Sequence, residues 1–483
     1  MALVLGAALG PYVTHVEVRD AETGLLRATG AARHSERGGP NDDPARWWRS
    51  LVSAVGQTSE REIAAISVTG SHPSLVVLDG AGAVLQPTQP WPDLAGRGAP
   101  DAAVHRLAWL KRSDPATLDR LGMALLPHDW LTHRLTGRPV TDRASASLTG
   151  AWAATTEDWR RDVLRDLAPR GARDWWRDRL PTVLGPSERA DWLDAPMYDL
   201  LGLRGRPIVG PGTTATTAIA LALGLRAGRV AVSLDSTTTA LVGLAQPISD
   251  RGDVVRCHAD AAGRHLAVAS AGDGIDLLDT IQALFDIDAR ELHALSTDTA
   301  TATGTGRSVT ATGLAVVPEA TGAAGTVVAG LTAGTTRRDV VRATVDGIAC
   351  AALDRLDLAL RAGGTWADDE PLRLGAPRAH IELMAQVLAD LSSRAVRPTA
   401  ESSLAAAGAC IQAAAVLTGG PPDDVADAWD LGAEAWVEPA DTSSRQPRRQ
   451  AHADAYARQQ RASSADGQPS APPARSAVMR ASS

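Results

Sequence analysis

The spacing of apolar positions changes from strand-like to helix-like within the first quarter of the chain. The first 33 residues contain two runs of alternating apolar and polar positions, joined by DAETG, a segment typical of a hairpin turn. In NDDPARWWRSLVSAVGQT, Trp47, Leu51 and Val55 share one helical face, and Pro44 marks the helix start. IAAISVTG predicts a buried strand, and SLVVLDGAGAVLQPTQPW predicts two strands around a Gly-rich turn. This order of elements predicts an α/β layer.

Residues 101–200 have a different character. Their seven tryptophans are scattered through Arg- and Asp-rich segments of helical spacing, which predicts a helical insertion. A second α/β block begins at GRVAVSLDSTTTALVGLAQPI and repeats the order of strand, polar turn and strand. RRDVVRATVDGIACAALDRLDLALRAGG predicts a long helix that ends at Gly363. AAAGACIQAAAVLTGG predicts a small-residue helix that packs very close to another helix or to a ligand.

The last segment, residues 441–483, loses apolar periodicity and is rich in Ser, Arg, Gln and Pro. Such a segment cannot bury enough apolar surface to offset the entropy lost on ordering. We therefore expect a disordered, solvated tail with at most one short helix. Contact of its basic residues with an acidic partner is the less favoured alternative.

Composition narrows the class of protein. A chain of 483 residues is long enough for two or three domains. A net charge of −8 argues against a nucleic-acid-binding surface and favours a small-molecule partner. Cys257, Cys350 and Cys410 are widely spaced, so neither a structural zinc nor a redox dithiol is expected. The N-terminus lacks the basic region of a signal peptide, and no run of about 18 apolar residues predicts a membrane span. We expect a cytoplasmic protein.

Several short motifs occur in an order that resembles one known family. GAALG, DPARWW, ISVTGSH, LLPHDWLTHRLTG with TDRASAS, IVGPGTTATTAIALALG and AAAGACIQAAAVLTG follow one another as in FGGY carbohydrate kinases, nearest to the xylulokinase branch. The pair LLPHDWLTHRLTG and TDRASAS is the most specific. The resemblance covers residues 1–436 and leaves the tail unmatched.

The resemblance implies an α/β fold of two lobes, the actin-like (ribonuclease H-like) ATPase fold, with a helical insertion and a disordered C-terminal tail. Residues 1–222 would form the sugar-binding lobe, residues 223–440 the nucleotide-binding lobe, and residues 441–483 the tail. The implied activity is phosphorylation of D-xylulose to D-xylulose 5-phosphate, in xylose catabolism, with ATP and Mg²⁺ as cofactors. The implied partners are the sugar and ATP, without nucleic acid or membrane, and a homodimer is left open.

On the sugar side, the resemblance points to four residues. His72, beside Pro73, would hydrogen-bond a sugar hydroxyl, Trp91 would stack on the carbon face of the sugar, and Asp93 would anchor the polyol. An alternative of equal weight is a capped strand end with a core tryptophan. Asp142 and Ser145 are expected to set a turn, and no metal ligand is assigned.

On the nucleotide side, the resemblance points to glycines and hydroxyl side chains in the turns and in the small-residue helix. These positions are Gly10, Gly212, Ser236, Thr237, Gly375 and Gly408. His128 beside Asp129 is expected to belong to a helix start.

The chain departs from the family pattern at positions that the resemblance assigns to catalysis and phosphate binding. Ala8 stands where the family has an acid, Asp235 replaces a glycine in the second phosphate turn, and Thr213 occupies the position of the general base, normally an Asp. A threonine hydroxyl has too high a pKa to act alone as a base near neutral pH, and losing a base typically costs a factor of about 10²–10⁴ in rate. Two alternatives therefore stay open: a catalytically impaired, pseudokinase-like binding protein, and an altered sequence of an active kinase.

Overall fold

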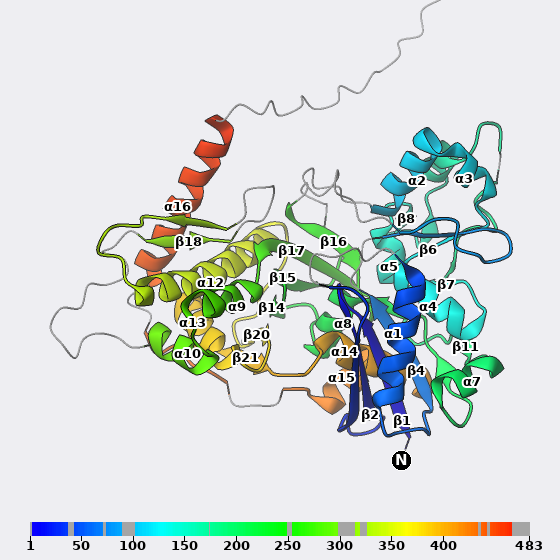
Figure 1. Cartoon of the computed structure of the whole chain (residues 1–483), viewed down its shortest axis with the longest axis horizontal. Coiled ribbons are helices and arrows are strands. Elements are labelled where there is room, and N and C mark those ends of the chain that lie inside the picture. The colour runs from blue at the N-terminus through cyan, green and yellow to red at the C-terminus, as the bar shows by residue number, and fades with distance from the viewer. Residues whose placement is uncertain are drawn as a thin grey trace, which may run out of the picture.

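The chain folds into two lobes, each built on one mixed β-sheet, with a helical insertion beside the first lobe (Figure 1). The structure is a computed structural model. It describes residues 2–36, 43–70, 74–88, 102–172, 174–248, 254–297, 314–318, 326–432, 436–441 and 445–465. Among these residues, no helix is long and apolar enough to cross a membrane.

The sheet of the first lobe has the strand order β11-β12-β4-β1-β2-β3, and β13 also pairs with β4. Its strands are β1 (Leu3–Leu9), β2 (Val13–Asp20), β3 (Leu26–Arg33), β4 (Ala65–Gly70), β11 (Asp191–Trp192), β12 (Ile208–Val209) and β13 (Thr213–Thr214). β1, β4 and β12 are parallel, whereas β2 and β3 extend the sheet as an antiparallel meander. This confirms the predicted opening meander.

Two helices cover one face of that sheet. α1 (Pro44–Gln57) begins as predicted, because the Asp43 side chain accepts a hydrogen bond from the Ala45 N–H and proline occupies the first turn. Trp47 and Leu51 of α1 and Leu131 of α4 (Pro127–Thr136) pack in one core with the apolar side chains of β1, β2 and β4. The apolar positions that recur at helical spacing in the sequence are therefore the α1 side chains that pack in this core.

The insertion has its own small core, which includes Leu107, Leu110 and Trp176. Its helices are α2 (Ala102–Ser113), α3 (Pro115–Arg120), α5 (Arg143–Leu148) and α6 (Arg161–Leu167), whereas α7 (Ala195–Leu201) packs against α1 in the core of the first lobe. Its short strands are β5 (Val76–Leu78), β6 (Met123–Leu125), β7 (Val140–Asp142), β8 (Trp152–Ala153), β9 (Asp158–Trp159) and β10 (Thr182–Leu184). The predicted helical insertion is confirmed, with short strands between its helices.

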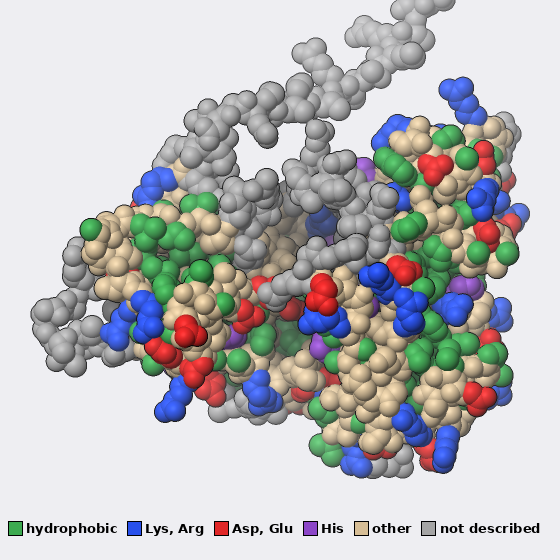
Figure 2. Space-filling view, in the orientation of Figure 1, with side chains coloured by type: hydrophobic (Ala, Val, Ile, Leu, Met, Phe, Trp, Pro, Cys, Tyr) green, Lys and Arg blue, Asp and Glu red, His purple; other side chains and the backbone are tan. Residues whose placement is uncertain are grey.

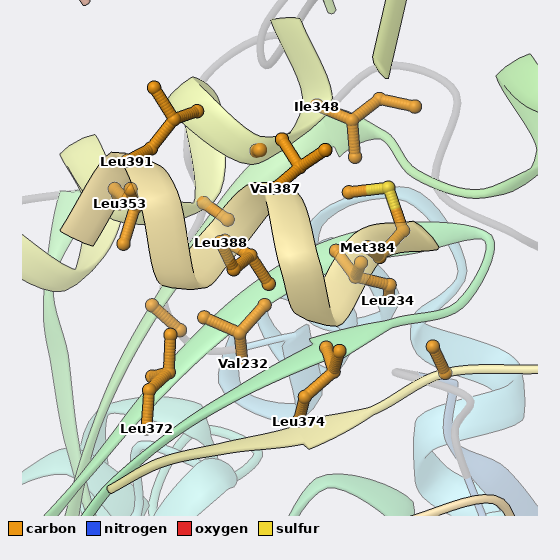
Figure 3. Packing of buried hydrophobic residues seen from close by; sticks show 14 of the residues in the cluster. Val232, Leu234, Ile348, Leu353, Leu372, Leu374, Met384, Val387, Leu388 and Leu391 are labelled. Atoms are coloured by element: carbon orange, nitrogen blue, oxygen red, sulfur yellow. The ribbon is translucent and has the colours of Figure 1, made fainter. Parts of the chain in front are cut away.

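The second lobe has the strand order β16-β17-β15-β14-β20-β21. Its strands are β14 (Val230–Leu234), β15 (Thr237–Leu244), β16 (Arg256–Ala259), β17 (His265–Asp273), β20 (Leu372–Gly375) and β21 (Val396–Thr399), beside a separate hairpin of β18 (Ala315–Val317) and β19 (Val327–Ala329). Its helices are α9 (Asp276–Phe285), α10 (Ala289–Thr297), α12 (Arg337–Arg361) and α13 (Ile381–Ser392). Figure 3 shows Met384 and Leu388 of α13 above Val232 and Leu374 of the sheet.

Two helices between the lobes pack very closely against each other. α8 (Ala215–Ala222) follows β13, and α14 (Leu404–Thr418) packs against α8, β1 and β4, followed by α15 (Pro422–Trp429). A Cβ atom on Gly408 would lie 1.9 Å from the Ala218 carbonyl oxygen, and one on Gly6 would lie 2.2 Å from the Ala406 carbonyl oxygen. Glycine is therefore required at both crossings. The predicted close packing of the small-residue helix is confirmed.

The sequence allowed at most one short helix in the tail, and this underestimated α16 (Arg445–Ala465), which is 21 residues long. This helix stands beside β18 in Figure 1. Buried Arg448 pairs with buried Asp346 of α12, and Ala455 is buried against the β18–β19 hairpin. The error arose because ion pairs with distant acids, rather than apolar periodicity, hold this helix. Residues 466–483 lie outside the described residues.

Candidate active site

Three strands of the first lobe end side by side at one edge of the sheet. Ala8 of β1 is the partner of Thr69 in β4, and Thr69 is the partner of Thr213 in β13. Ligands of open α/β sheets bind beyond the carboxyl ends of parallel strands. Fully buried Thr69 has no hydrogen-bond partner for its hydroxyl among the described residues. This edge is therefore a candidate site.

The turn between β12 and β13 is held in place by the protein itself. Gly212 has φ +79°, and a Cβ atom on it would lie 2.5 Å from the Val68 carbonyl oxygen. Gln412 of α14 donates a hydrogen bond from Nε2 to the Gly212 carbonyl at 3.0 Å, and Ser67 Oγ donates to Gln412 Oε1 at 2.5 Å. Gly212 is thus required by the backbone geometry, and a contact with nucleotide at this residue stays a prediction.

The Thr213 side chain is buried among other polar groups. Its Oγ1 donates a hydrogen bond to Asp142 Oδ2 at 2.7 Å and lies 2.7 Å from Thr217 Oγ1, which in turn lies 2.8 Å from Thr214 Oγ1. Asp142 caps α5 and accepts hydrogen bonds from the Ser145 and Ala144 backbone N–H groups. Asp142 sets the turn that the sequence predicted, and it also reaches Thr213, which the sequence did not predict.

The start of α4 adds a second polar pair. His128 Nε2 lies 2.8 Å from Ser145 Oγ and 3.3 Å from Asp129 Oδ1. Burial lowers the pKa of His128 to about 3. Burial, together with the negative charge of Asp142, raises the pKa of Asp129 well above its usual range. Because burial disfavours both charged forms, we treat His128 and Asp129 as a neutral pair rather than an ion pair.

Burial also raises the pKa of Asp142, whereas the hydrogen bonds from Ser145 and Thr213 act in the opposite direction. Both residues are almost inaccessible, with Asp142 3% exposed and Thr213 0% exposed. The edge of the first lobe therefore does hold a carboxyl group, one hydrogen bond away from Thr213, the residue that the resemblance puts at the position of the base.

The two expected phosphate turns belong to different lobes. In the first, the Gly10 N–H donates to the Val13 carbonyl at 3.0 Å. In the second, Asp235, Ser236 and Thr237 are exposed, and the Asp235 carbonyl accepts from the Ile275 N–H at 2.8 Å. Burial lowers the pKa of His15 on β2, and the negative charge of Asp235 acts in the opposite direction.

The remaining predicted positions are less informative. A Cβ atom on Gly375 would lie 2.3 Å from Leu404 Cδ1, the end of a flexible side chain that can move, whereas backbone packing requires the glycine at position 408. Contact of either glycine with a nucleotide stays a prediction. His72, Pro73, Trp91 and Asp93 lie outside the described residues.

A protein-borne metal site does not fit the residues present. Among the described residues, no group of three or more His, Cys, Asp or Glu side chains could hold a metal ion. Ala8 presents a methyl group where the family has an acid, and Asp235 is a single carboxylate on its turn. We therefore derive no step through a metal ligand of the protein.

Comparisons with known proteins agree with one another. Residues 98–220 match the N-terminal domain of the FGGY family of carbohydrate kinases. The chain is 32% identical over 463 residues to the xylulose kinase of Streptomyces coelicolor, covering 89% of this chain and 91% of that protein. It is 31% identical over 468 residues to the xylulose kinase of Streptomyces rubiginosus, with the same two coverages. The crystal structure of xylulose kinase from Bifidobacterium adolescentis matches with a TM-score of 0.73 and 26% identity, over 94% of this chain and 99% of that chain.

Proposed function

The chain belongs to the FGGY family of carbohydrate kinases, and we propose that it transfers the terminal phosphoryl group of ATP to D-xylulose, giving D-xylulose 5-phosphate. The observation that carries this proposal is the match to xylulose kinases over nine-tenths of their length, 91% for the Streptomyces coelicolor protein. The two-lobe fold, which resembles the crystal structure of xylulose kinase from Bifidobacterium adolescentis, supports it. The proposal places the reaction in the cytoplasm and leaves open whether the protein forms a homodimer.

The turns of the two lobes have complementary roles in this proposal. Gly10 offers backbone close to the phosphates, and Ser236 and Thr237 offer exposed hydroxyl donors. Phosphoryl transfer needs positioning and neutralisation of charge more than covalent chemistry. Kinases of this family use ATP with a divalent metal, and we propose Mg²⁺, which supplies positive charge to the phosphates. Asp235, on the second turn, is a single carboxylate that could face that ion.

On the sugar side, the proposal keeps the residues that the resemblance indicated. His72 and Asp93 would hydrogen-bond sugar hydroxyls, and Trp91 would stack on the carbon face beside Pro73. Gly70, which precedes this segment, ends β4 at the same sheet edge as Thr213. The proposed sugar-binding segment therefore follows directly in the chain after a residue at the candidate site.

The test is turnover by the purified full chain. With ATP, Mg²⁺ and D-xylulose, we expect ADP release with a kcat of about 1 s⁻¹ or more, as for ordinary kinases. Phosphorus NMR of the product should show a phosphomonoester on the sugar. Glycerol and gluconate serve as comparison substrates and should be phosphorylated far more slowly. Equal or faster turnover of either comparison substrate would show that the sugar is wrongly assigned.

A second candidate function rests on Ala8 and Thr213, which replace two family carboxylates. It is a pseudokinase-like protein that binds sugar or nucleotide without turnover. Calorimetric binding of ATP and D-xylulose, with no ADP release over hours, would support it and would overturn the kinase proposal.

A further inference from the structure

We infer that the cavity between α12, α16 and β18 is a binding site for a small organic anion. The cavity has a volume of about 220 Å³, and residues from four segments that are far apart in the sequence line it. α16 packs against both α12 and β18, which brings these segments together (Figure 1). The inference does not rest on the proposed kinase function, since none of the lining residues takes part in that proposal.

Each of the two helices lines the cavity with one face. On α12 the lining residues recur every three or four positions, and they are Ala351, Asp354, Arg355, Leu358 and Arg361. On α16, His452 and Tyr456 are four positions apart. Residues that are three or four positions apart lie on the same side of a helix, so the cavity follows the seam between the two helices.

Much of the buried wall of the cavity is apolar. Ala271 near the end of β17, Val317 of β18 and Ala351 of α12 line the cavity, and all three are buried. Leu358 of α12 lines the same cavity and is half-buried. Ligand pockets typically combine such a wall with a few polar groups that fix the orientation of the ligand. The wall therefore offers a place for the apolar body of a small molecule.

Two arginines at the cavity carry charge that the described part of the chain does not neutralise. The side chains of half-buried Arg355 and exposed Arg361 make no ion pair or hydrogen bond with described residues. By contrast, Arg449 of α16 pairs with Asp354 at 2.8 Å and with Asp357 at 2.7 Å. Two guanidinium groups without acidic partners favour an anionic ligand.

Asp354 is the one acid among the described residues that line the cavity, and it is already paired. Burial acts to raise the pKa of Asp354, but the contacts with His452 and Arg449 hold that pKa below its usual value. Asp354 is therefore ionised near pH 7, and Arg449 balances its charge. Its charge does not cancel the charges of Arg355 and Arg361.

Guanidinium groups beside apolar surface match one class of ligand. Arginine binds a carboxylate or a phosphate through two parallel hydrogen bonds. Tyr456, which is 36% exposed, adds a ring face and a hydroxyl to the cavity. The cavity is smaller than the range of about 300–1,000 Å³ that is usual for drug-sized ligands, so it suits a body of one ring rather than a nucleotide. The expected ligand is thus a carboxylate or a phosphate monoester of that size.

Four probes test the charge and the apolar body separately on the purified full chain. Benzoate and phenyl phosphate each carry an oxyanion on a ring, benzamide keeps the ring without the charge, and inorganic phosphate keeps the charge without the ring. Calorimetric titration should give a Kd of about 1 mM or below for benzoate or phenyl phosphate, an affinity in keeping with ligands of this size. Benzamide and inorganic phosphate should bind at least about tenfold more weakly. The tighter of the two ring probes identifies the acid group that the site prefers.

Substitutions locate the bound anion. Arg355→Met and Arg361→Met each remove one charge while keeping a long side chain, and each should weaken binding of the tighter ring probe by about tenfold. Ala351→Leu fills part of the cavity and should weaken binding at least as much. The matched control is Arg458→Met, which removes an exposed arginine of α16 that does not line the cavity, and this variant should bind the probe as the wild type does. The melting temperature of each variant shows whether it is folded, and if Ala351→Leu does not fold, the two arginine variants decide.

The possible results separate cleanly. Binding of a ring probe that Arg355→Met and Arg361→Met weaken, and that Arg458→Met leaves unchanged, supports the inference. Absence of binding of both ring probes up to about 10 mM overturns it, and so does equally tight binding of benzamide or inorganic phosphate. A ring probe that binds both arginine variants as tightly as the wild type lies elsewhere, and equal weakening by Arg458→Met would mean attraction by overall charge, so either result overturns the site. No result involves turnover, and the kinase proposal is therefore tested separately.

Discussion

The two turns that flank the candidate site are built in opposite ways. The turn at Gly212 and Thr213 is buried, and its polar groups bond to α5, α8 and α14. The turn at Asp235–Thr237 is exposed, and the Asp235 side chain accepts only from the neighbouring Ser236 N–H among its described hydrogen bonds. By the resemblance, each turn carries a residue that differs from the family pattern, Thr213 in the first and Asp235 in the second. In the buried turn the surrounding fold supplies a carboxyl group that accepts a hydrogen bond from Thr213, whereas the exposed turn has only solvent and ligand to balance its new charge.

The largest effect should come from breaking the backbone of the buried turn. Gly212→Ala places a side chain at φ +79° and a Cβ atom 2.5 Å from the Val68 carbonyl oxygen. Left-handed strain and the clash with backbone together should lower the free energy of unfolding by about 3 kcal/mol or more. Urea unfolding measures this change.

The matched control for that experiment is Gly56→Ala on α1, where a Cβ atom meets no described atom within 4 Å. Alanine is the better helix former, so this variant should gain about 0.5–1 kcal/mol. Similar losses in both variants would mean that Gly212 is not constrained by its conformation.

A smaller effect should come from Asp129, a buried carboxyl near Asp142. Burial raises the pKa of Asp129, so the folded state binds its proton more tightly than the unfolded state does. Stability should then fall as pH rises from about 3.8 through the raised folded pKa. Asp129→Asn lacks this penalty and still can accept from the Leu126 N–H. It should be more stable than the wild type at pH 8, by about 1.4 kcal/mol for each unit of pKa shift.

Thermal or urea unfolding of Asp129→Asn and of the wild type across pH 4–8 measures this difference. The difference should be smallest at the acidic end, where Asp129 is protonated in the folded state and only partly ionised in the unfolded state. A variant that is less stable than the wild type at pH 8 would indicate that an ionised Asp129 makes a favourable contact in the fold.

The smallest effect should come from the exposed turn. Asp235→Asn removes one negative charge beside the proposed triphosphate site, and at an exposed position the gain is about 1 kcal/mol or less. The KM for ATP should fall by about threefold, and the free energy of unfolding should stay within about 0.5 kcal/mol of the wild type. Asp235→Glu keeps the charge and should keep the wild-type KM. An increased KM in Asp235→Asn would place the carboxylate on the metal that accompanies ATP.

Much of the fold could be predicted from the sequence because local signals agreed with the tertiary structure. Alternating apolar positions marked the strands, Pro44 marked the start of α1, and the small residues of α14 marked a close helix crossing. The order of motifs indicated the family. The length of the C-terminal helix was underestimated because Arg448 is stabilised by Asp346, 102 positions earlier, and local composition does not reveal such a partner.

Part of the candidate site, too, could be predicted from the sequence, and part could not. The sequence by itself determined that Gly212 heads a turn, that Thr213 stands where a carboxylate is expected and that Ala8 lacks an acid. Only the tertiary structure decided that Asp142, 71 positions before Thr213, accepts its hydrogen bond. Turn conformation depends on residues that adjoin in the chain, whereas the partner of a buried hydroxyl depends on which element packs over it. That packing depends on the hydrophobic cores of the sheet and of the insertion, and the local spacing of residues in the sequence does not predict it.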